Sequence, residues 1–252
     1  MNFQISRSQA LQCVPQRKLV EALEQTIRNC PECSKRTDVK IDQNLCNNCS
    51  VRNKAINRYA EANIPIRYWP LEMSIGFEGD PILLKEYNEI IIDLRKTYNK
   101  GPAICFAGGH GLGKTLLLSN ILKRVVEKGY SGLYTTLSDI VSIATSREYD
   151  DRDTARKELL LIDFLAIDEF DPRYMANDKS SDLFGKILEE VFRSRAQNCL
   201  PTFFCTNSPN VVESFTGNIK QSISSLMNYI RVVAVLGKDF RKQEKQERQE
   251  LK

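Results

Sequence analysis

The apolar positions between residues 80 and 240 follow two alternating patterns. Short apolar runs, which are typical of buried strands, occur at residues 103–107, 132–137, 164–168, 202–206 and 232–236. Apolar residues that recur every three or four positions predict helices at about residues 114–128, 138–146, 183–196 and 219–229. Apolar strands that alternate with helices are typical of a parallel sheet covered on both faces. The sequence therefore predicts an α/β domain at residues 80–240.

A further helix is predicted at the start of this domain, where Asp80 precedes Pro81. An aspartate in this position accepts a hydrogen bond from a free backbone N–H of the first turn, and proline suits the first helical position. Apolar residues then form one stripe from Leu83 to Leu94, which predicts a single amphipathic helix.

The most informative residues between positions 1 and 63 are cysteines. Four of them form two Cys-x-x-Cys pairs within one short stretch: Cys30, Cys33, Cys46 and Cys49. In a reducing compartment this spacing favours one tetrahedral Zn²⁺ site, with a redox pair or unligated thiols as the alternatives. Four thiolates leave no open position on the metal, so the zinc would be structural. Helical patterns at about 15–27 and 51–63 flank the pairs, and we predict a small helical zinc domain at residues 1–63.

Residues 64–79 are interpreted as a linker, because Pro65 and Pro70 prevent a continuous helix through them. This segment contains Trp69, the only tryptophan of the sequence. The indole could pack on the base of a bound nucleotide, or it could pack one domain against the other. The sequence leaves both possibilities open.

Length and charge narrow the class of protein. The 252 residues have room for one large domain and one small one. No apolar run is long enough to span a membrane, and residues 1–20 lack the apolar core of a signal peptide, so we expect a cytoplasmic protein with no membrane partner. The net charge is +4, with both ends basic around a slightly acidic middle. Basic ends could meet nucleic acid or an acidic protein, or could be ordinary solvated faces.

The most informative motif is Gly-x4-Gly-Lys-Thr at residues 108–115, between a predicted strand and a predicted helix. The glycines allow backbone N–H groups to approach phosphate oxygens closely. Lys114 supplies positive charge to the β and γ phosphates, and Thr115 offers its hydroxyl to Mg²⁺. The predicted ATP-binding residues are Gly108, Gly109, His110, Gly111, Leu112, Gly113, Lys114, Thr115 and Leu116.

A carboxylate pair follows another predicted strand, at Asp168 and Glu169. Asp168 would hold Mg²⁺ together with Thr115, and Glu169 would orient and deprotonate the attacking water. The alternative is a helix-capping pair. Asp163, at the start of the same strand, is expected to have a structural role.

Asn207 comes directly after the strand predicted at 202–206. Because parallel strands present their carboxyl ends at one edge of a sheet, Asn207 could reach the γ-phosphate or the attacking water. It could instead be a turn residue before Ser208 and Pro209.

These elements resemble the AAA+ helicase loaders of the DnaC/DnaI type and the related IstB-type ATPases. The resemblance rests on the Gly-x4-Gly-Lys-Thr motif, Asp168-Glu169 and Thr206-Asn207, with IPIRYWPL at 64–71 and VLGKDFR at 235–241, and it covers about residues 64–241. It implies a P-loop AAA+ parallel-sheet core. Only residues 237–252 follow the last predicted strand, so the resemblance implies a core that lacks a C-terminal lid, with a charged tail at 241–252.

The resemblance also implies a function. The protein would be an ATP-dependent loader of the replicative helicase in DNA replication, with a Mg²⁺-dependent ATPase activity that is weak in the isolated protein. Residues 1–63 would bind the hexameric helicase, and the AAA+ core would bind single-stranded DNA and form an ATP-dependent homo-oligomer. The alternatives are an IstB-like transposition helper and, in another class, a zinc-ribbon nucleic-acid adaptor with a structural nucleotide.

In ATPases of this kind an arginine from a neighbouring subunit completes the site. By resemblance it would lie on the helix before the last strand, where Arg231 is the basic residue and where Ser225 and Tyr229 stand in places at which arginine is expected. Arg193 or Arg195 could act instead.

The residues that would contact DNA are suggested only by their position between the second and third strands. They are mixed with acidic residues, so a solvated helix is the alternative. The candidates are Arg147, Arg152, Arg156 and Lys157.

Overall fold

The computed structural model describes residues 55–73, 77, 79–145, 149–171, 178–215, 217–237 and 239. The four cysteines predicted to bind zinc lie outside these ranges, as does the charged tail at 241–252. Both therefore remain predictions, and so does the boundary of the N-terminal domain at residue 63.

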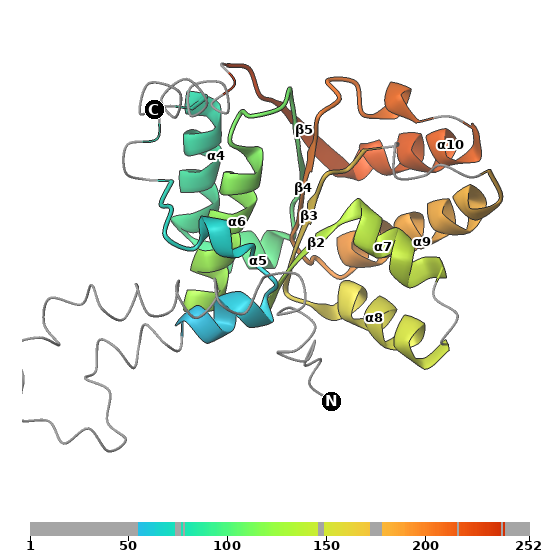
Figure 1. Ribbon diagram of the computed structural model, residues 1–252, viewed down its shortest axis with the longest axis horizontal. Helices are drawn as coiled ribbons and strands as arrows, with labels where there is room; N and C mark the ends of the chain where they lie inside the picture. Colours follow the sequence, from blue (N-terminus) through green and yellow to red (C-terminus); the bar gives the residue numbers. More distant parts are fainter. Residues whose placement is uncertain are drawn as a thin grey trace, which may run out of the picture.

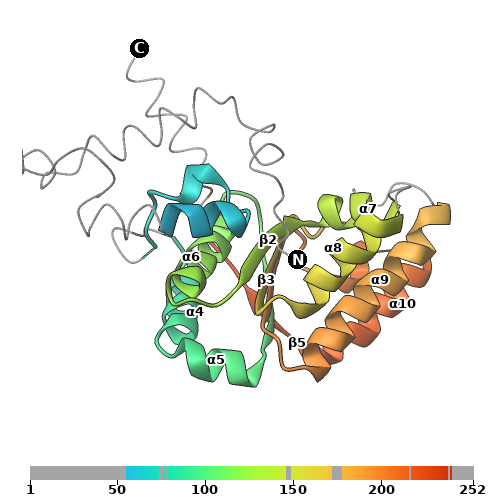
Figure 2. The ribbon, with the colours of Figure 1, turned by 90° about the horizontal axis from the view of Figure 1, so that it is seen from below.

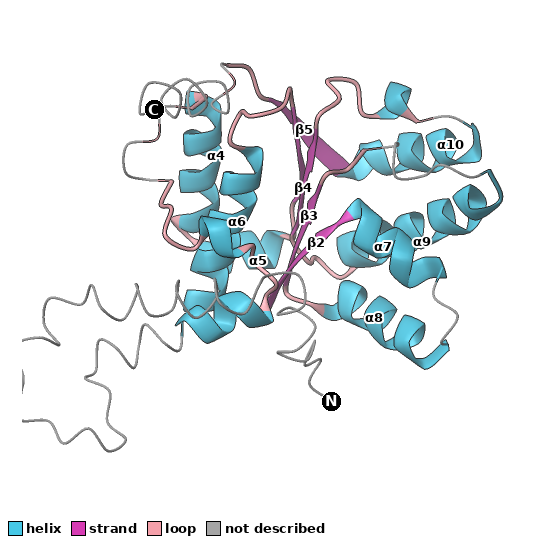
Figure 3. Cartoon of the chain, in the orientation of Figure 1, coloured by secondary structure: helices cyan, strands magenta, loops and turns pink. Residues whose placement is uncertain are grey.

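Five parallel strands form one sheet in the described part of the chain, seen edge-on in Figure 3. They are β1 (Ala103–Ala107), β2 (Gly132–Thr136), β3 (Phe164–Asp168), β4 (Thr202–Thr206) and β5 (Ile230–Ala234). Their spatial order is β2-β3-β4-β1-β5, and every neighbouring pair is parallel. The predicted parallel sheet is confirmed.

Helices cover both faces of the sheet (Figures 1 and 2). One face carries α4 (Pro81–Ile91), α5 (Leu94–Lys100) and α6 (Lys114–Glu127), together with a helix at residues 55–61. The other face carries α7 (Leu137–Thr145), α8 (Tyr149–Leu161), α9 (Asp178–Gln197) and α10 (Gly217–Leu226). Short 3₁₀ turns lie at Ile66–Tyr68 (η2), Val212–Ser214 (η4) and Met227–Tyr229 (η5). Within the described ranges, no helix is both long and apolar enough to cross a bilayer.

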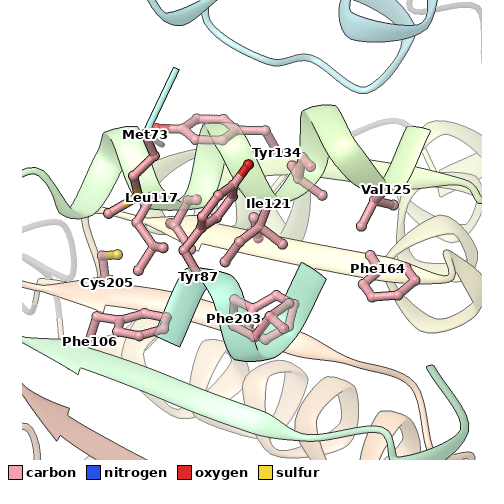
Figure 4. Packing of buried hydrophobic residues seen from close by; sticks show 14 of the residues in the cluster. Met73, Tyr87, Phe106, Leu117, Ile121, Val125, Tyr134, Phe164, Phe203 and Cys205 are labelled. Atoms are coloured by element: carbon pink, nitrogen blue, oxygen red, sulfur yellow. The ribbon is translucent and has the colours of Figure 1, made fainter. Parts of the chain in front are cut away.

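The uninterrupted apolar strands are explained by two cores, one on each face. Side chains alternate along a strand, so in β1 Ile104 and Phe106 join the core beneath α4 and α6, while Cys105 and Ala107 join the core beneath α7–α10. Figure 4 shows part of the first core, with Phe106, Phe203 and Phe164 in one layer. Strands buried on both faces are mostly apolar, which is the reason that these runs are recognisable in the sequence.

The stripe from residue 83 to residue 94 forms two helices, so the prediction of a single helix was wrong. The predicted start is confirmed, because Asp80 Oδ1 accepts a hydrogen bond from Ile82 N at 2.9 Å. The break has a local cause: Asp93 accepts from Lys96 N at 2.9 Å and so begins α5. Leu94 is then buried, whereas Ile92 at the break is 85% exposed.

The last strand begins two residues earlier than the pattern predicts. Ile230 to Ala234 pair with the whole of β1, from Ala103 to Ala107. Beyond Val235 the ladder ends, because Leu236 N donates to Asp80 Oδ2 at 2.7 Å. One aspartate therefore caps α4 and also fixes the segment that leaves β5.

The linker packs against the core beside α6. Trp69 Nε1 donates to Ile64 O at 2.9 Å, and the indole lies edge-on to Tyr59 with 6.0 Å between ring centroids. Glu72 forms ion pairs with Lys123 at 2.8 Å and Arg124 at 2.9 Å. These contacts support the packing interpretation of Trp69.

Gly101 ends α5 in the left-handed region at φ 53°, and a Cβ there would lie 2.1 Å from the carbonyl carbon of Cys199. We predict that Gly101→Ala lowers the free energy of unfolding by about 3 kcal/mol or more, as measured by urea denaturation, because it adds a backbone collision to the left-handed penalty. Gly129→Ala is the matched control, since Gly129 has φ 91° and open space around a Cβ. It should cost about 1 kcal/mol, and equal losses for both variants would contradict this account.

Candidate nucleotide-binding site

The loop between β1 and α6 has the backbone of a phosphate cradle. Gly111 (φ 73°) and Gly113 (φ 89°) adopt conformations that favour glycine. A Cβ on Gly108 would lie 2.2 Å from Val235 O, so a larger residue would displace the segment after β5. A Cβ on Gly109 would meet nothing nearer than 4.0 Å, which leaves this part of the loop open.

The N-terminus of α6 fits an anion. Gly113 provides no side-chain cap, and the first turn contains no acidic residue. The first N–H groups of a helix have no partner within the helix, and they carry the positive end of its dipole. A phosphate group can accept hydrogen bonds from these donors.

Lys114 lies at the centre of the site and is only 6% exposed. Its ammonium donates to Gly108 O at 2.7 Å, to Gly109 O and to Asn207 Oδ1 at 3.1 Å. The structure thus brings together two predicted site residues, Lys114 and Asn207, that are far apart in the sequence. The turn after β4 is capped by Thr206, whose Oγ1 accepts from Ser208 N at 3.1 Å, so Asn207 is not the capping side chain of this turn.

Asp168, the last residue of β3, is buried and holds two donors. Oδ2 accepts from the Tyr134 hydroxyl at 2.6 Å, and Oδ1 accepts from Glu169 N at 2.8 Å. Glu169 is exposed and has φ 50°, a conformation that is uncommon for residues other than glycine. Residues 169–171 are not helical, so the helix-capping alternative for this pair is not supported.

Three strand ends meet at this edge of the sheet. β4 lies between β3 and β1. Gly108 N donates to Thr206 O at 3.2 Å, and Phe170 N donates to Cys205 O at 2.8 Å. The loop after β1, the carboxylate at the end of β3 and Asn207 after β4 therefore lie together at the edge of the sheet where the sequence predicts one site.

The chemistry of the donor set fits a magnesium–triphosphate complex. Mg²⁺ is usually held by one or two carboxylates together with phosphates and water, rather than by a dense protein cage. Asp168 and Thr115 supply such groups, and no cluster of three or more His, Cys, Asp or Glu side chains suited to a metal occurs among the described residues. Two further residues of the loop differ in exposure: Leu112 is buried, whereas His110 is exposed.

Cys205 lies near the charged groups but takes no part in this chemistry. Burial, and secondarily the charge of Asp168, raises the pKa of the Cys205 thiol well above its ordinary value. It is therefore a neutral core residue at physiological pH.

Asp163 has the structural role that the sequence predicts. Its Oδ2 accepts from Ser131 N and Ser131 Oγ, both at 2.8 Å, and so joins the start of β3 to the start of β2. These bonds lie at the opposite ends of the strands from the site.

Arg231 lies near the start of β5, where it pairs in register with Ile104, away from the site of its own chain. Its guanidinium forms two 2.6 Å hydrogen bonds with the carboxylate of Glu86, a buried residue. These bonds raise the pKa of Arg231. Its role as the arginine that completes a neighbouring subunit's site stays a prediction, and that role would require the pair with Glu86 to open.

Arg195 is a structural residue, and the alternative that it completes a neighbouring site was wrong. It has no exposed surface, and each of its guanidinium N–H groups has an acceptor within the chain. The acceptors are Thr202 Oγ1, Leu159 O, Ile162 O, Asp163 O and Pro201 O. Burial lowers the pKa of Arg195 to about 9, which still leaves it charged at neutral pH. Arg193 is exposed and pairs with Glu189 at 2.7 Å.

The described DNA-contact candidates are paired with acidic groups. Arg156 Nε donates to Glu190 at 2.9 Å, and Lys157 pairs with Asp153 at 2.6 Å. These pairs favour the interpretation of α8 as a solvated helix. Arg147 and the side chain of Arg152 lie outside the described residues.

No protein-family model matches the chain, and no curated protein matches it in sequence. A crystal structure of DnaI is similar with a TM-score of 0.56 at 15% identity, over 69% of this chain and 93% of that chain. The DnaC helicase loader has a TM-score of 0.51 at 18% identity, over 68% and 99%. The replication initiator DnaA, bound to AMPPCP and single-stranded DNA, has a TM-score of 0.52 at 16% identity, over 64% and 47%.

The described residues thus have an AAA+-like P-loop α/β fold, similar to that of the DnaI and DnaC structures. This confirms the predicted α/β fold of the core, whereas the zinc domain and the lack of a C-terminal lid stay predictions. At such low identities the likeness concerns the fold.

Tyr134 was missed by the sequence reasoning. Its position two residues before the end of a strand was the only available signal, because side chains two apart share one face of a sheet. The signal was weak, since nothing in the sequence tells which strand lies beside β3.

The opposite roles of Arg195 and Arg193 can be tested by stability. A lysine has only three donors, so Arg195→Lys should remove the hydrogen bonds to at least two of the five acceptors and lower the free energy of unfolding by about 2–4 kcal/mol. Arg193→Ala should change it by no more than about 0.5 kcal/mol. Urea denaturation of both variants measures the difference, and similar stabilities would contradict the structural role of Arg195.

Proposed function

We propose that the chain is an ATP-dependent loader of the replicative helicase. The observation that carries this proposal is the meeting of Lys114, Asp168 and Asn207 at one edge of an AAA+ sheet whose structural relatives include the DnaC helicase loader. A Mg²⁺-dependent ATPase activity is part of the proposal, with zinc as a structural metal in residues 1–63.

Lys114 is suited to couple nucleotide binding to movement. An ammonium has three N–H donors, and acceptors in the chain already use them. Phosphate oxygens must therefore displace or share at least one of these bonds. The bond to Asn207 is the longest of the three, so we infer that it yields first and frees Asn207 to hydrogen-bond the γ-phosphate or the attacking water.

The carboxylates have separate tasks in this proposal. Asp168 is held by two donors and would bind Mg²⁺ with Thr115, and the metal would neutralise charge on the phosphates. Glu169 is exposed at the same strand end and would orient the water and accept its proton. Arg231 of a neighbouring copy would stabilise the charge that develops on the γ-phosphate, and the need to release Glu86 is consistent with weak turnover by the isolated protein.

The partners are proposed from resemblance and fold. Residues 1–63 would bind the hexameric helicase, and the AAA+ core would bind single-stranded DNA and associate with further copies. DnaA, whose structure includes AMPPCP and single-stranded DNA, supports this proposal through its shared fold. A cytoplasmic location follows from the proposed role in replication.

The ATP site can be tested with two substitutions and the wild-type protein as reference. We predict that Lys114→Ala abolishes ATP binding, because it removes the positive charge of the cradle. Glu169→Gln should keep ATP binding and lose at least about 100-fold in turnover, because the amide cannot accept the proton of water. Calorimetry measures binding and phosphate release measures turnover. Equal binding by all three proteins would refute the site.

The loader function can be tested by affinity purification of the full-length protein from its native lysate. We predict that a hexameric helicase co-purifies and that single-stranded DNA stimulates ATP turnover, with an effect that falls steeply as salt rises. Recovery of a transposase with preference for duplex DNA would support the transposition helper instead. Bound ATP without turnover under any condition would support the zinc-ribbon adaptor.

A further inference from the structure

The hydroxyl of Tyr134 is directed at the carboxylate that is proposed to bind Mg²⁺. Tyr134 lies on β2, and its side chain shares a face of the sheet with Asp168 on the neighbouring strand β3. The 2.6 Å separation between the hydroxyl and Asp168 Oδ2 is typical of a strong, charge-assisted hydrogen bond. Both residues are buried, so water does not compete freely for this bond.

This bond restricts how Asp168 can turn. The backbone N–H of Glu169 holds Oδ1, and the Tyr134 hydroxyl holds Oδ2. A carboxylate oxygen has two lone pairs, so each oxygen keeps one for a metal or a metal-bound water. Without the hydroxyl, Oδ2 would lose its donor and the carboxylate could rotate about its Cβ–Cγ bond.

Packing alone does not require a tyrosine at this position. The ring belongs to the same core cluster as Tyr87, Leu117 and Phe203 (Figure 4), where a phenylalanine would bury the same ring surface. The hydroxyl is thus the part of Tyr134 that its hydrogen bond to Asp168 requires.

Tyr134 is itself held from outside the sheet. β2 is an edge strand, yet Tyr134 N donates to Ala62 O at 2.8 Å and Tyr134 O accepts from Asn63 Nδ2 at 3.0 Å. The helix at residues 55–61 ends here in a Schellman turn, in which Asn63 N bonds Ala60 O and Ile64 N bonds Tyr59 O. Asn63 has φ 54°, which asparagine tolerates.

We propose that Tyr134 is a positioning residue that sets the Mg²⁺ affinity of the nucleotide site by orienting Asp168, and that Ala62 and Asn63 clamp Tyr134 for this task. The inference rests on the proposed ATP site. Its consequence is that the chain leaving the predicted helicase-binding domain is joined to Asp168 through a single tyrosine.

The test is a Mg²⁺ titration of ATP binding and turnover in the full-length protein. Tyr134→Phe should raise the Mg²⁺ concentration at half-maximal effect by about 10–100-fold, a range typical of lost support for a metal ligand. Its ATP affinity in excess EDTA, measured by calorimetry, should stay at the wild-type value. Asn63→Gly, which keeps the left-handed conformation but removes the bond to Tyr134 O, should shift the titration in the same direction by a few-fold.

Tyr87→Phe is the matched control. Tyr87 is also buried in the same cluster, and its hydroxyl accepts a hydrogen bond from Arg124 rather than contacting Asp168. This variant should leave the Mg²⁺ titration unchanged, although both tyrosine variants can lose thermal stability. A Tyr134→Phe titration within about twofold of wild type would overturn the proposal. Should that variant fail to fold, an unshifted Asn63→Gly titration would overturn it.

Measurements of Mg²⁺-dependent ATP binding by the wild-type protein distinguish failure of this inference from failure of the proposed function on which it rests. Absence of Mg²⁺-dependent ATP binding in the wild type would refute the proposed function, and the inference with it. Normal wild-type binding with an unshifted Tyr134→Phe variant would refute the role of Tyr134 alone.

Discussion

The buried ammonium of Lys114 is the interaction on which the site depends. A charge withdrawn from water costs several kcal/mol unless it is fully hydrogen-bonded. Two loop carbonyls, from Gly108 and Gly109, and the amide oxygen of Asn207 meet this requirement. The first two lie after β1 and the third after β4, and these strands are neighbours. Satisfying one cation thus holds the loop and the adjacent strand end in place.

Helix α6, which begins with Lys114, also contacts the linker. Lys123 and Arg124 bind Glu72, and at the far end of α6 the carbonyl of Val126 accepts from Arg58 while Glu127 accepts from the Tyr59 hydroxyl. One rigid element therefore connects the nucleotide site with the segment that leads to residues 1–54. A displacement at one end of α6 would therefore be transmitted to the other end, because a helix packed in a dense core moves as a unit.

Much of this architecture could be predicted from the sequence, because its physical causes are local. Apolar runs marked all five strands, Asp80 before Pro81 marked the start of α4, and glycine spacing marked the loop. The break between α4 and α5 was missed although its cause, the Asp93 cap, is local. The other errors arose where a distant residue decides the outcome. Asp80 Oδ2 binds Leu236 N and so ends the β5 ladder, and the acceptors of Arg195 come from the ends of α8, β3 and β4. Neither contact has a local pattern.

The sequence by itself determined the identities of the reactive groups and the kind of sheet that presents them: Lys114, Thr115, Asp168, Glu169 and Asn207 at the ends of apolar, parallel strands. Only the tertiary structure decided which charges are free to act. It placed Arg195 in the interior, joined Arg231 to Glu86 and set Tyr134 against Asp168. The reason is that periodicity encodes which face of an element is buried, whereas the partner of a buried polar group depends on which elements lie side by side in space.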